Sequence, residues 1–189
     1  MTEQQLLIDC LKRLNSLQLD YYLTGSMASN YWGIPRTTHD LDFVICIDRS
    51  AIKPLVSAFS DDYYIDEHAV AAAFSQPRQF NVIDTRSALK IDFWLPASSA
   101  FDQEMLRRRV HKSISNVPVW IATPEDVILH KLVWNQITPS DRQLRDAAGI
   151  FAVQGSGLDI EYLNRWATSL GLSGDLENIL SGRIRPKST

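Results

Sequence analysis

The sequence predicts an α/β (α+β) protein built on a small mixed β-sheet, with helices on one face and a helical C-terminal part. Two observations support this class. Up to residue 122, short runs of alternating or continuous apolar residues are interleaved with segments of helical spacing. From residue 123 onward only helical spacing continues, so we divide the chain into a core, residues 1–122, and a C-terminal helical region, residues 123–189.

Length and composition limit the classes of protein that fit. The chain has 189 residues, enough for one domain or for one domain with a helical appendage. It is 45% hydrophobic and 22% charged, a balance typical of a globular protein with a real core. The formal net charge of −3 provides no overall attraction to nucleic acid, so any such contact would need a local basic patch.

The N-terminus and the cysteines favour a cytoplasmic protein. Met1-Thr2-Glu3-Gln4-Gln5 has neither the basic residues nor the long apolar core of a signal peptide. No apolar run approaches the roughly 18 residues of a membrane span, so we expect no membrane partner. Cys10 and Cys46 are expected to be buried, reduced thiols rather than a disulfide or a metal site.

The first elements prepare a turn that suits a phosphate. Residues 2–18 have apolar positions at helical spacing, and residues 21–24 form a short apolar strand. Gly25 and Ser26 make a turn into a helix of about two turns. Gly25 lets the backbone approach a ligand closely, while Ser26 offers a hydroxyl beside the free N–H groups of the helix start.

A second strand begins with two carboxylates. Asp40 and Asp42 are two residues apart, so in an extended strand both side chains leave the same face. The opposite face is apolar and comprises Leu41, Phe43 and Ile45. Two neighbouring carboxylates repel each other, and a divalent cation held by their oxygens removes that cost. A phosphate-binding turn followed by metal-binding carboxylates suggests a nucleotide.

The middle of the chain supplies a third carboxylate. The pattern predicts a helix at 50–60 capped by Ser50, a strand at 63–65, and a helix at 66–76 ended by Pro77. Strands at 80–84 and 89–95 have hairpin spacing. In the second of these strands, the residues on one face are Lys90, Asp92 and Trp94.

The most basic stretch follows a helix predicted at 98–108. Arg107-Arg108-Arg109-x-x-Lys112 is interpreted either as a solvated helix end, where cations suit the helix dipole, or as a contact for triphosphate or an RNA backbone. Strands are expected at 110–115 and 117–122, around Asn116.

The C-terminal helices have recognisable starts. Thr123-Pro124-Glu125-Asp126 provides a hydroxyl cap, a proline and two acids, and Thr138-Pro139-Ser140-Asp141 is expected to repeat the device. In the first helix Lys131 lies to one side of the apolar stripe. In the second helix the predicted polar face comprises Arg142, Arg145, Asp146 and Gly149. A hinge at 155–157, a helix at 159–172 and a frayed tail at 181–189 complete the chain.

An Asp-x-Asp pair alone is a weak motif, since haloacid-dehalogenase-type phosphatases and metal-dependent glycosyltransferases also use one. Those enzymes place the carboxylates at the C-terminal end of an apolar strand. In this chain Asp40 and Asp42 precede the apolar run. The order along the chain therefore favours a different class.

The set of residues resembles the motif of the DNA polymerase β-like nucleotidyltransferase superfamily: Gly25-Ser26, thirteen residues, then Asp40-x-Asp42, with Asp92 on a later strand. Arg36-x-x-x-Asp40-x-Asp42 is more specifically similar to the small bacterial branch that includes AbiEii-type toxins. The later motifs of that branch match Pro124-Glu125-Asp126-x-x-x-x-Lys131-Leu132 and Arg145-Asp146. Known toxin-type members are commonly longer, which leaves a toxin role open.

This resemblance implies Mg²⁺-dependent transfer of a nucleoside monophosphate from a nucleoside triphosphate (NTP), such as ATP, to an acceptor hydroxyl, with release of pyrophosphate. Asp40 and Asp42 would hold two Mg²⁺ ions, and Asp92 would share one of them, act as general base, or do both. The nucleotide-binding set would be Gly25, Ser26, Arg36, Lys131 and Asp146. A solvated lysine and a surface Arg-Asp salt bridge are the simpler interpretations of Lys131 and Arg145-Asp146.

Several questions are not decided by the sequence. The acceptor could be tRNA, a protein hydroxyl or a small molecule such as an antibiotic. The role could be that of a toxin, a resistance enzyme or a housekeeping enzyme, and the protein could be a monomer or a homodimer. Two other functions also stay open: an idle nucleotide-binding or antitoxin-like protein on the same fold, and an unrelated metal-dependent transferase.

Overall fold

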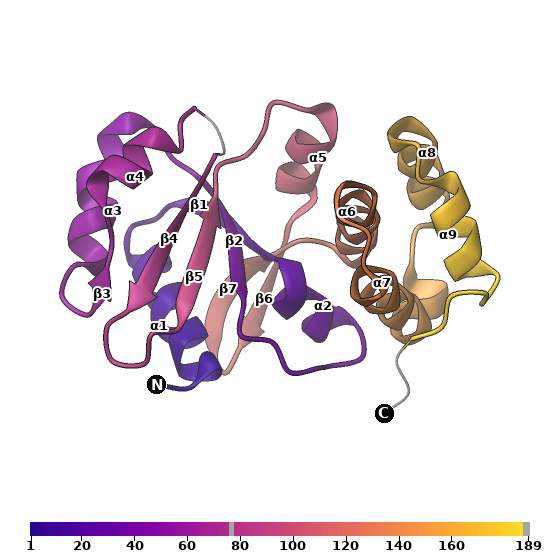
Figure 1. Cartoon of the computed structure of the whole chain (residues 1–189), viewed down its shortest axis with the longest axis horizontal. Coiled ribbons are helices and arrows are strands. Elements are labelled where there is room, and N and C mark those ends of the chain that lie inside the picture. The colour runs from indigo at the N-terminus through magenta and orange to yellow at the C-terminus, as the bar shows by residue number, and fades with distance from the viewer. Residues whose placement is uncertain (76–77, 187–189) are drawn as a thin grey trace. The chain divides into compact units, whose positions relative to one another are not determined.

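The computed structural model describes residues 1–75 and 78–186. Two compact units are present (Figure 1). The sheet unit comprises Met1–Thr24 and Thr38–Ile121, and the helical unit comprises Gly25–Thr37 and Ala122–Thr189. The sequence-based division after residue 122 placed residues 25–37 with the core, whereas in the structure this segment packs with the C-terminal helices.

A seven-stranded mixed sheet organises the sheet unit, with the strand order β3-β4-β5-β2-β1-β7-β6 (Figure 1). The strands are β1 Asp20–Thr24, β2 Leu41–Cys46, β3 Tyr63–Tyr64, β4 Gln79–Asp84, β5 Lys90–Trp94, β6 Val110–Ile114 and β7 Val117–Ile121. β2 runs antiparallel to β1 and parallel to β5. β4–β5 and β6–β7 are antiparallel hairpins. The predicted fold class, a mixed α/β sheet with helices, is confirmed.

Short helices flank the strands of this unit: α1 Glu3–Ser16, the 3₁₀ turn η1 Arg49–Ala51, α3 Ile52–Phe59, α4 Glu67–Ala72 and α5 Ala100–Arg108. Thr2 and Gln5 form a capping box at the start of α1. The predicted cap Ser50 is wrong, because Asp48 accepts the hydrogen bond from the Ser50 N–H and starts a 3₁₀ turn. Helix α4 ends at Ala72, and the predicted terminator Pro77 lies outside the described residues.

One face of the sheet forms the apolar core. Leu23, Phe43 and Phe93 are fully buried on adjacent strands, in agreement with the predicted alternation. Phe59 of α3 contacts the Phe93 ring, with centroids 5.9 Å apart, so α3 covers this face. The side chains of Asp42 and Asp92 leave the opposite face. The apolar packing of one face thereby fixes the position of the polar residues on the other.

The helical unit comprises α2 Gly25–Trp32, α6 Pro124–Ile137, α7 Asp141–Gln154, the 3₁₀ turn η2 Gly155–Gly157, α8 Ile160–Leu170 and α9 Ser173–Leu180. Thr123 caps α6 as predicted. The predicted cap Thr138 does not cap α7, because it is the C-cap residue of α6. Ser140 occupies the N-cap position of α7, and its side chain makes no capping hydrogen bond. The sequence analysis did not predict α9.

Close backbone packing joins α7 to the segment after α2. A Cβ at Gly33 would lie 2.8 Å from the Ile150 backbone nitrogen, and a Cβ at Gly149 would lie 3.6 Å from Ile34. Gly149 is therefore buried rather than on a polar face as predicted. The error arose because helical periodicity alone does not reveal that the chain before Asp40 packs against α7.

Two further expectations concern the cysteines and membrane spans. Both cysteines are free thiols; Cys10 is buried, as predicted, and Cys46 is half-buried. Within residues 1–75 and 78–186, no helix combines the length and the apolar character needed to cross a membrane.

Candidate functional site

A row of polar residues crosses four adjacent strands of the sheet unit. Asp42 of β2 pairs in register with Thr24 of β1 on one side and with Asp92 of β5 on the other. Asn81 of β4 continues the row beyond Asp92. Residues paired in register leave the same face, and neighbouring strands lie about 4.8 Å apart. The structure therefore brings the predicted residues Asp42 and Asp92 side by side.

Asp40 lies just before this row. β2 begins at Leu41, so Asp40 precedes the strand rather than opening it as predicted. The first pair of the parallel register is Leu41–Ile91. Extending this register by one residue toward the N-terminus places Asp40 beside Lys90. We call Thr24, Asp40, Asp42, Lys90 and Asp92 the carboxylate row.

Asp92 has two very different oxygens. Its Oδ2 accepts a hydrogen bond from Lys90 Nζ at 2.6 Å, whereas its Oδ1 is buried and has no hydrogen-bond partner among the described residues. Thr24 Oγ1 is likewise buried without a partner in the described structure. The hydrogen bond to Asp92 raises the pKa of Lys90 above its ordinary value, burial opposes this, and the charges of Asp92, Asp40 and Asp42 raise it further. Lys90 is therefore firmly protonated at neutral pH.

The chemistry of the carboxylate row fits a hard divalent cation. Carboxylate and hydroxyl oxygens are the ligand types that Mg²⁺ takes, and a buried oxygen without a donor is open to a cation. As they stand, the described residues do not include a cluster of three or more His, Cys, Asp or Glu side chains that could hold a metal ion. The metal role of Asp40, Asp42 and Asp92 thus stays a prediction.

The start of α2 has the backbone that the predicted turn requires. Gly25 has a φ of +61°, in the left-handed region that strongly favours glycine. Ser26 is buried, and its Oγ accepts a hydrogen bond from Arg36 Nη2 at 2.8 Å. The Ser29 hydroxyl donates to the Gly25 carbonyl and steadies the first turn. Gly25 and Ser26 thus open the helical unit.

Four predicted residues, Ser26 among them, form a cluster inside the helical unit. Arg36 donates two hydrogen bonds to Asp146, from Nε to Oδ1 at 2.8 Å and from Nη2 to Oδ2 at 2.9 Å. Lys131 Nζ donates to Asp146 Oδ2 at 3.0 Å. We call Ser26, Arg36, Lys131 and Asp146 the arginine cluster. It joins α2, the segment after α2, α6 and α7.

Burial distinguishes the arginine cluster from a surface salt bridge. The side chains of Lys131 and Asp146 are only 6% and 7% exposed, so the simpler interpretation of a solvated lysine is wrong. Burial by itself would raise the pKa of Asp146, but the hydrogen bond from Arg36 and the charge of Lys131 outweigh it. The pKa of Asp146 consequently lies below its ordinary value, and the carboxylate stays ionised.

Arg36 is also fixed through its backbone. Asn30 Oδ1 accepts from the Arg36 N–H at 3.0 Å, and Asn30 Nδ2 donates to the Arg36 carbonyl at 2.7 Å. Asn30 therefore closes the segment after α2 into a loop that aims Arg36 at Asp146. The neighbour of Asp146 behaves differently: Arg145 is exposed and lies 3.8 Å from Asp141, a surface pair.

The acidic residues at the start of α6 have structural contacts. Asp126 is fully buried and accepts hydrogen bonds from Thr123 at 2.8 Å and from the Tyr162 hydroxyl at 2.5 Å. Glu125 accepts from the Asp159 N–H at 3.0 Å. This part of the predicted motif thereby links α6 to α8.

Arginines of the basic stretch at the end of α5 have carboxylate partners. Arg107 lies 2.7 Å from Glu104, and Arg109 lies 2.5 Å from Asp20 and stacks over the Trp120 ring. The pairing of Arg107 with Glu104 inside the last turns of α5 favours the helix-end interpretation over a contact with triphosphate or RNA.

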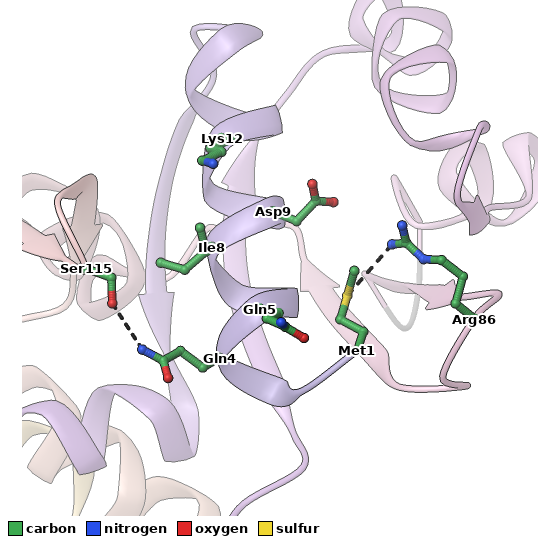
Figure 2. Close-up of a pocket in the computed structure, with 8 residues that line it drawn as sticks. All are labelled: Met1, Gln4, Gln5, Ile8, Asp9, Lys12, Arg86 and Ser115. Atoms are coloured by element: carbon green, nitrogen blue, oxygen red, sulfur yellow. Dashed lines mark hydrogen bonds between the residues drawn. The ribbon is translucent and has the colours of Figure 1, made fainter.

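A hollow of about 610 Å³ lies along α1 (Figure 2). Figure 2 shows α1 side chains such as Gln5, Ile8 and Asp9 lining it, together with Arg86 and Ser115 from two turns. None of its lining residues belongs to the carboxylate row. We do not assign it a role.

The sequence analysis missed two members of the carboxylate row. Lys90 was placed on the same face as Asp92 without a role, and Thr24 was treated only as the end of a strand. The alternation of side chains identifies their faces, but the pairing of β1 with β2 and of β2 with β5 is needed to place them together.

Comparison with known proteins supports the fold. No family model matches the chain, and no curated protein matches it significantly in sequence. An antigenic nucleotidyltransferase-like protein from Paracoccidioides brasiliensis is 16% identical, with a TM-score of 0.56 over 98% of this chain and 94% of its own. The antibiotic-resistance factor ANT(2″)-Ia in solution is 12% identical, with a TM-score of 0.62 over 93% of this chain and 96% of its own.

A crystal structure of ANT(2″)-Ia in complex with adenylyl-2″-tobramycin also matches, at 13% identity and a TM-score of 0.60, over 89% of this chain and 98% of its own. At these identities the likeness concerns the fold. The chain has the fold of nucleotidyltransferase-like proteins over nearly its whole length.

Proposed function

We propose that this protein transfers a nucleoside monophosphate from an NTP to an acceptor hydroxyl and releases pyrophosphate, in a Mg²⁺-dependent reaction. The observation that carries the proposal is the pairing of Asp42 with Asp92 on parallel strands, on the face opposite the apolar core. Its fold is shared with ANT(2″)-Ia, which has been crystallised with adenylyl-2″-tobramycin. The sequence resemblance points to the AbiEii-type branch.

In this proposal Asp40, Asp42 and Asp92 provide the oxygen ligands for two Mg²⁺ ions. When bound, such ions orient a triphosphate and lower the pKa of an attacking hydroxyl. Asp92 Oδ1, which is buried and lacks a donor, is the oxygen best prepared to accept a cation or the proton of the acceptor hydroxyl.

The arginine cluster and the start of α2 would bind the phosphates. A φ of +61° at Gly25 suits a turn that presents backbone N–H groups to an anion. Arg36 and Lys131 offer fixed, charged donors, and Asp146 holds both in place. Positioned cations stabilise the charge that develops as pyrophosphate leaves.

A second candidate is an idle nucleotide-binding or antitoxin-like protein on the same fold. The observation that favours it is the ion pair between Lys90 and Asp92, which already occupies one oxygen of the proposed third carboxylate. Both candidates bind an NTP, but only the enzyme transfers its nucleotide to an RNA, protein or small-molecule acceptor.

Incubation with each α-³²P-labelled NTP, Mg²⁺ and a cell extract tests the proposal. We expect the label to move from one NTP to an RNA, a protein or a small molecule, and EDTA to abolish the transfer. The nature of the labelled product identifies the acceptor class. Calorimetric binding of an NTP without any transfer of label would instead support the idle form, and the absence of binding would contradict both.

A further inference from the structure

The carboxylate row contains a cation of its own. Lys90 and Asp92 are two residues apart on β5, so their side chains share a face. Lys90 Nζ lies 2.6 Å from Asp92 Oδ2, a short charge-assisted hydrogen bond. Its position next to Asp40 and diagonal to Asp42 follows from the parallel register. Lys90 therefore pairs with one predicted metal ligand, Asp92, and neighbours the strand positions of the other two.

The ion pair is asymmetric in its exposure. The Lys90 side chain is 47% exposed, whereas that of Asp92 is 8% exposed. Lysine has a compact ammonium on a flexible stem of four carbons and is strongly hydrated. Lys90 can thus withdraw into water at little cost, whereas the Asp92 carboxylate stays buried and needs a positive partner.

The pair also leaves part of the site unsatisfied. Asp92 Oδ1 and Thr24 Oγ1 are both buried without a partner among residues 1–75 and 78–186. If Lys90 only stabilised the fold, these two buried oxygens would remain without hydrogen bonds, which is unfavourable for the free energy of folding. A cation with several coordination positions satisfies more than one oxygen of the row, which a single ammonium hydrogen bond does not.

We propose that Lys90 is the internal counter-cation of the carboxylate row: its ammonium holds Asp92 in position until a divalent cation binds and then yields Asp92 Oδ2 to that cation. This inference rests on the proposed function, because it takes the row as the metal-binding group. Lys90 is a positioning residue in this scheme, since it acts on a metal ligand.

Metal binding and stability of four proteins test the inference without any nucleotide. The proteins are the wild type, Lys90→Met, Lys90→Arg and the control Lys53→Met, which removes an exposed lysine of α3. Mn²⁺ affinity is measured from the electron paramagnetic resonance signal of free Mn²⁺. Unfolding temperatures are measured in EDTA and in saturating Mn²⁺.

We expect Lys90→Met to bind Mn²⁺ about tenfold more tightly, because the ion no longer meets a competing positive charge. The same variant should unfold at a lower temperature in EDTA, and Mn²⁺ should remove the difference. Lys90→Arg keeps the charge and should restore the unfolding temperature in EDTA. Lys53→Met should match the wild type in both measurements.

Two contrary results have different meanings. One result is that Lys90→Met binds Mn²⁺ no more tightly than the wild type, or loses the same stability with and without Mn²⁺. Lys90 would then be only structural, and this would contradict the inference but not the proposed function. If neither protein binds Mn²⁺ at millimolar concentrations, the carboxylate row is not a metal site, and the proposed function falls together with the inference.

Discussion

The carboxylate row and the arginine cluster differ in how far their buried charges are compensated by neighbouring residues. In the arginine cluster a single carboxylate, Asp146, receives three hydrogen bonds from Arg36 and Lys131. In the carboxylate row Lys90 pairs with Asp92, which lies beside Asp42, and the buried Asp92 Oδ1 has no partner in the described structure. The cluster is stabilised by its own residues, whereas the row is left with a need for positive charge.

From this difference we infer different roles for the two groups. Groups that satisfy one another hold a fixed geometry, which suits residues that present donors to a ligand. Like charges placed side by side are costly and persist where a ligand relieves them, as at many functional sites. Substitutions in the two groups should therefore separate activity from stability.

The largest effect is expected in the carboxylate row. Asp42→Asn keeps the shape of the side chain but removes a charged oxygen ligand, so transfer of the labelled nucleotide should fall by about two to three orders of magnitude. Stability should be nearly unchanged, because asparagine has nearly the same shape as aspartate. Initial rates at saturating Mg²⁺, with circular dichroism as a check of folding, measure both.

Asp61→Asn is the matched control for this change, since Asp61 is exposed on the turn before β3 and lies outside the row. It should retain wild-type turnover. Equal activity of Asp42→Asn and the wild type would remove Asp42 from the catalytic assignment.

The second-largest effect is a loss of stability, and it is expected in the arginine cluster. Asp146→Asn leaves two buried or half-buried cations, Lys131 and Arg36, without their shared carboxylate, and should lower the free energy of unfolding by about 3 kcal/mol. Asp92→Asn should change it by less than about 1 kcal/mol, because Lys90 is half exposed and becomes hydrated. Urea denaturation followed by tryptophan fluorescence provides both values. A larger loss for Asp92→Asn would show that the row, too, is a stabilising network.

Much of the carboxylate row could be predicted from the sequence, because its signal is local. The alternation in Asp42-Phe43 and in Asp92-Phe93 identifies which side chains leave the apolar face, and the motif indicates which strands belong together. Thr24 and Lys90 could not be assigned, since their roles depend on strand register, which is set by packing over the whole sheet.

The arginine cluster was predicted less completely because its contacts are distant in sequence. Arg36 meets Asp146 across 110 positions, and the periodicity of α7 placed Asp146 and Gly149 on a polar face. The segment that covers them, including Gly33, comes from the other end of the chain. Helix α9 was missed for another reason: it has only eight residues and contains Gly174, a poor helix former.

The third effect uses pH to isolate the contribution of Asp146. Its pKa in the folded protein lies below the ordinary value of 3.8, so its stabilising contribution is complete above that value and is lost as the pH falls through the lowered pKa. The difference in unfolding free energy between the wild type and Asp146→Asn should thus be constant near neutral pH and shrink below about pH 4. Urea titrations at several pH values measure it. A difference that grows on acidification would contradict the assigned direction.

A glycine substitution with a small effect on stability is the sharpest test of ligand binding. Gly25 and Gly171 have similar left-handed backbones, with φ of +61° and +71°. Gly25→Ala and Gly171→Ala should each cost about 1 kcal/mol of unfolding free energy, because a Cβ is disfavoured in this region. An added Cβ at Gly171 meets nothing nearer than the Gln136 side chain at 4.0 Å, so that variant reports backbone strain alone.

Only Gly25→Ala should also weaken triphosphate binding, since a phosphate held by the N–H groups at the start of α2 needs close approach to the backbone. Calorimetric titration with a non-hydrolysable triphosphate and Mg²⁺ distinguishes the two variants. Equal affinities would remove Gly25 from the phosphate-binding set and leave the arginine cluster as the remaining candidate.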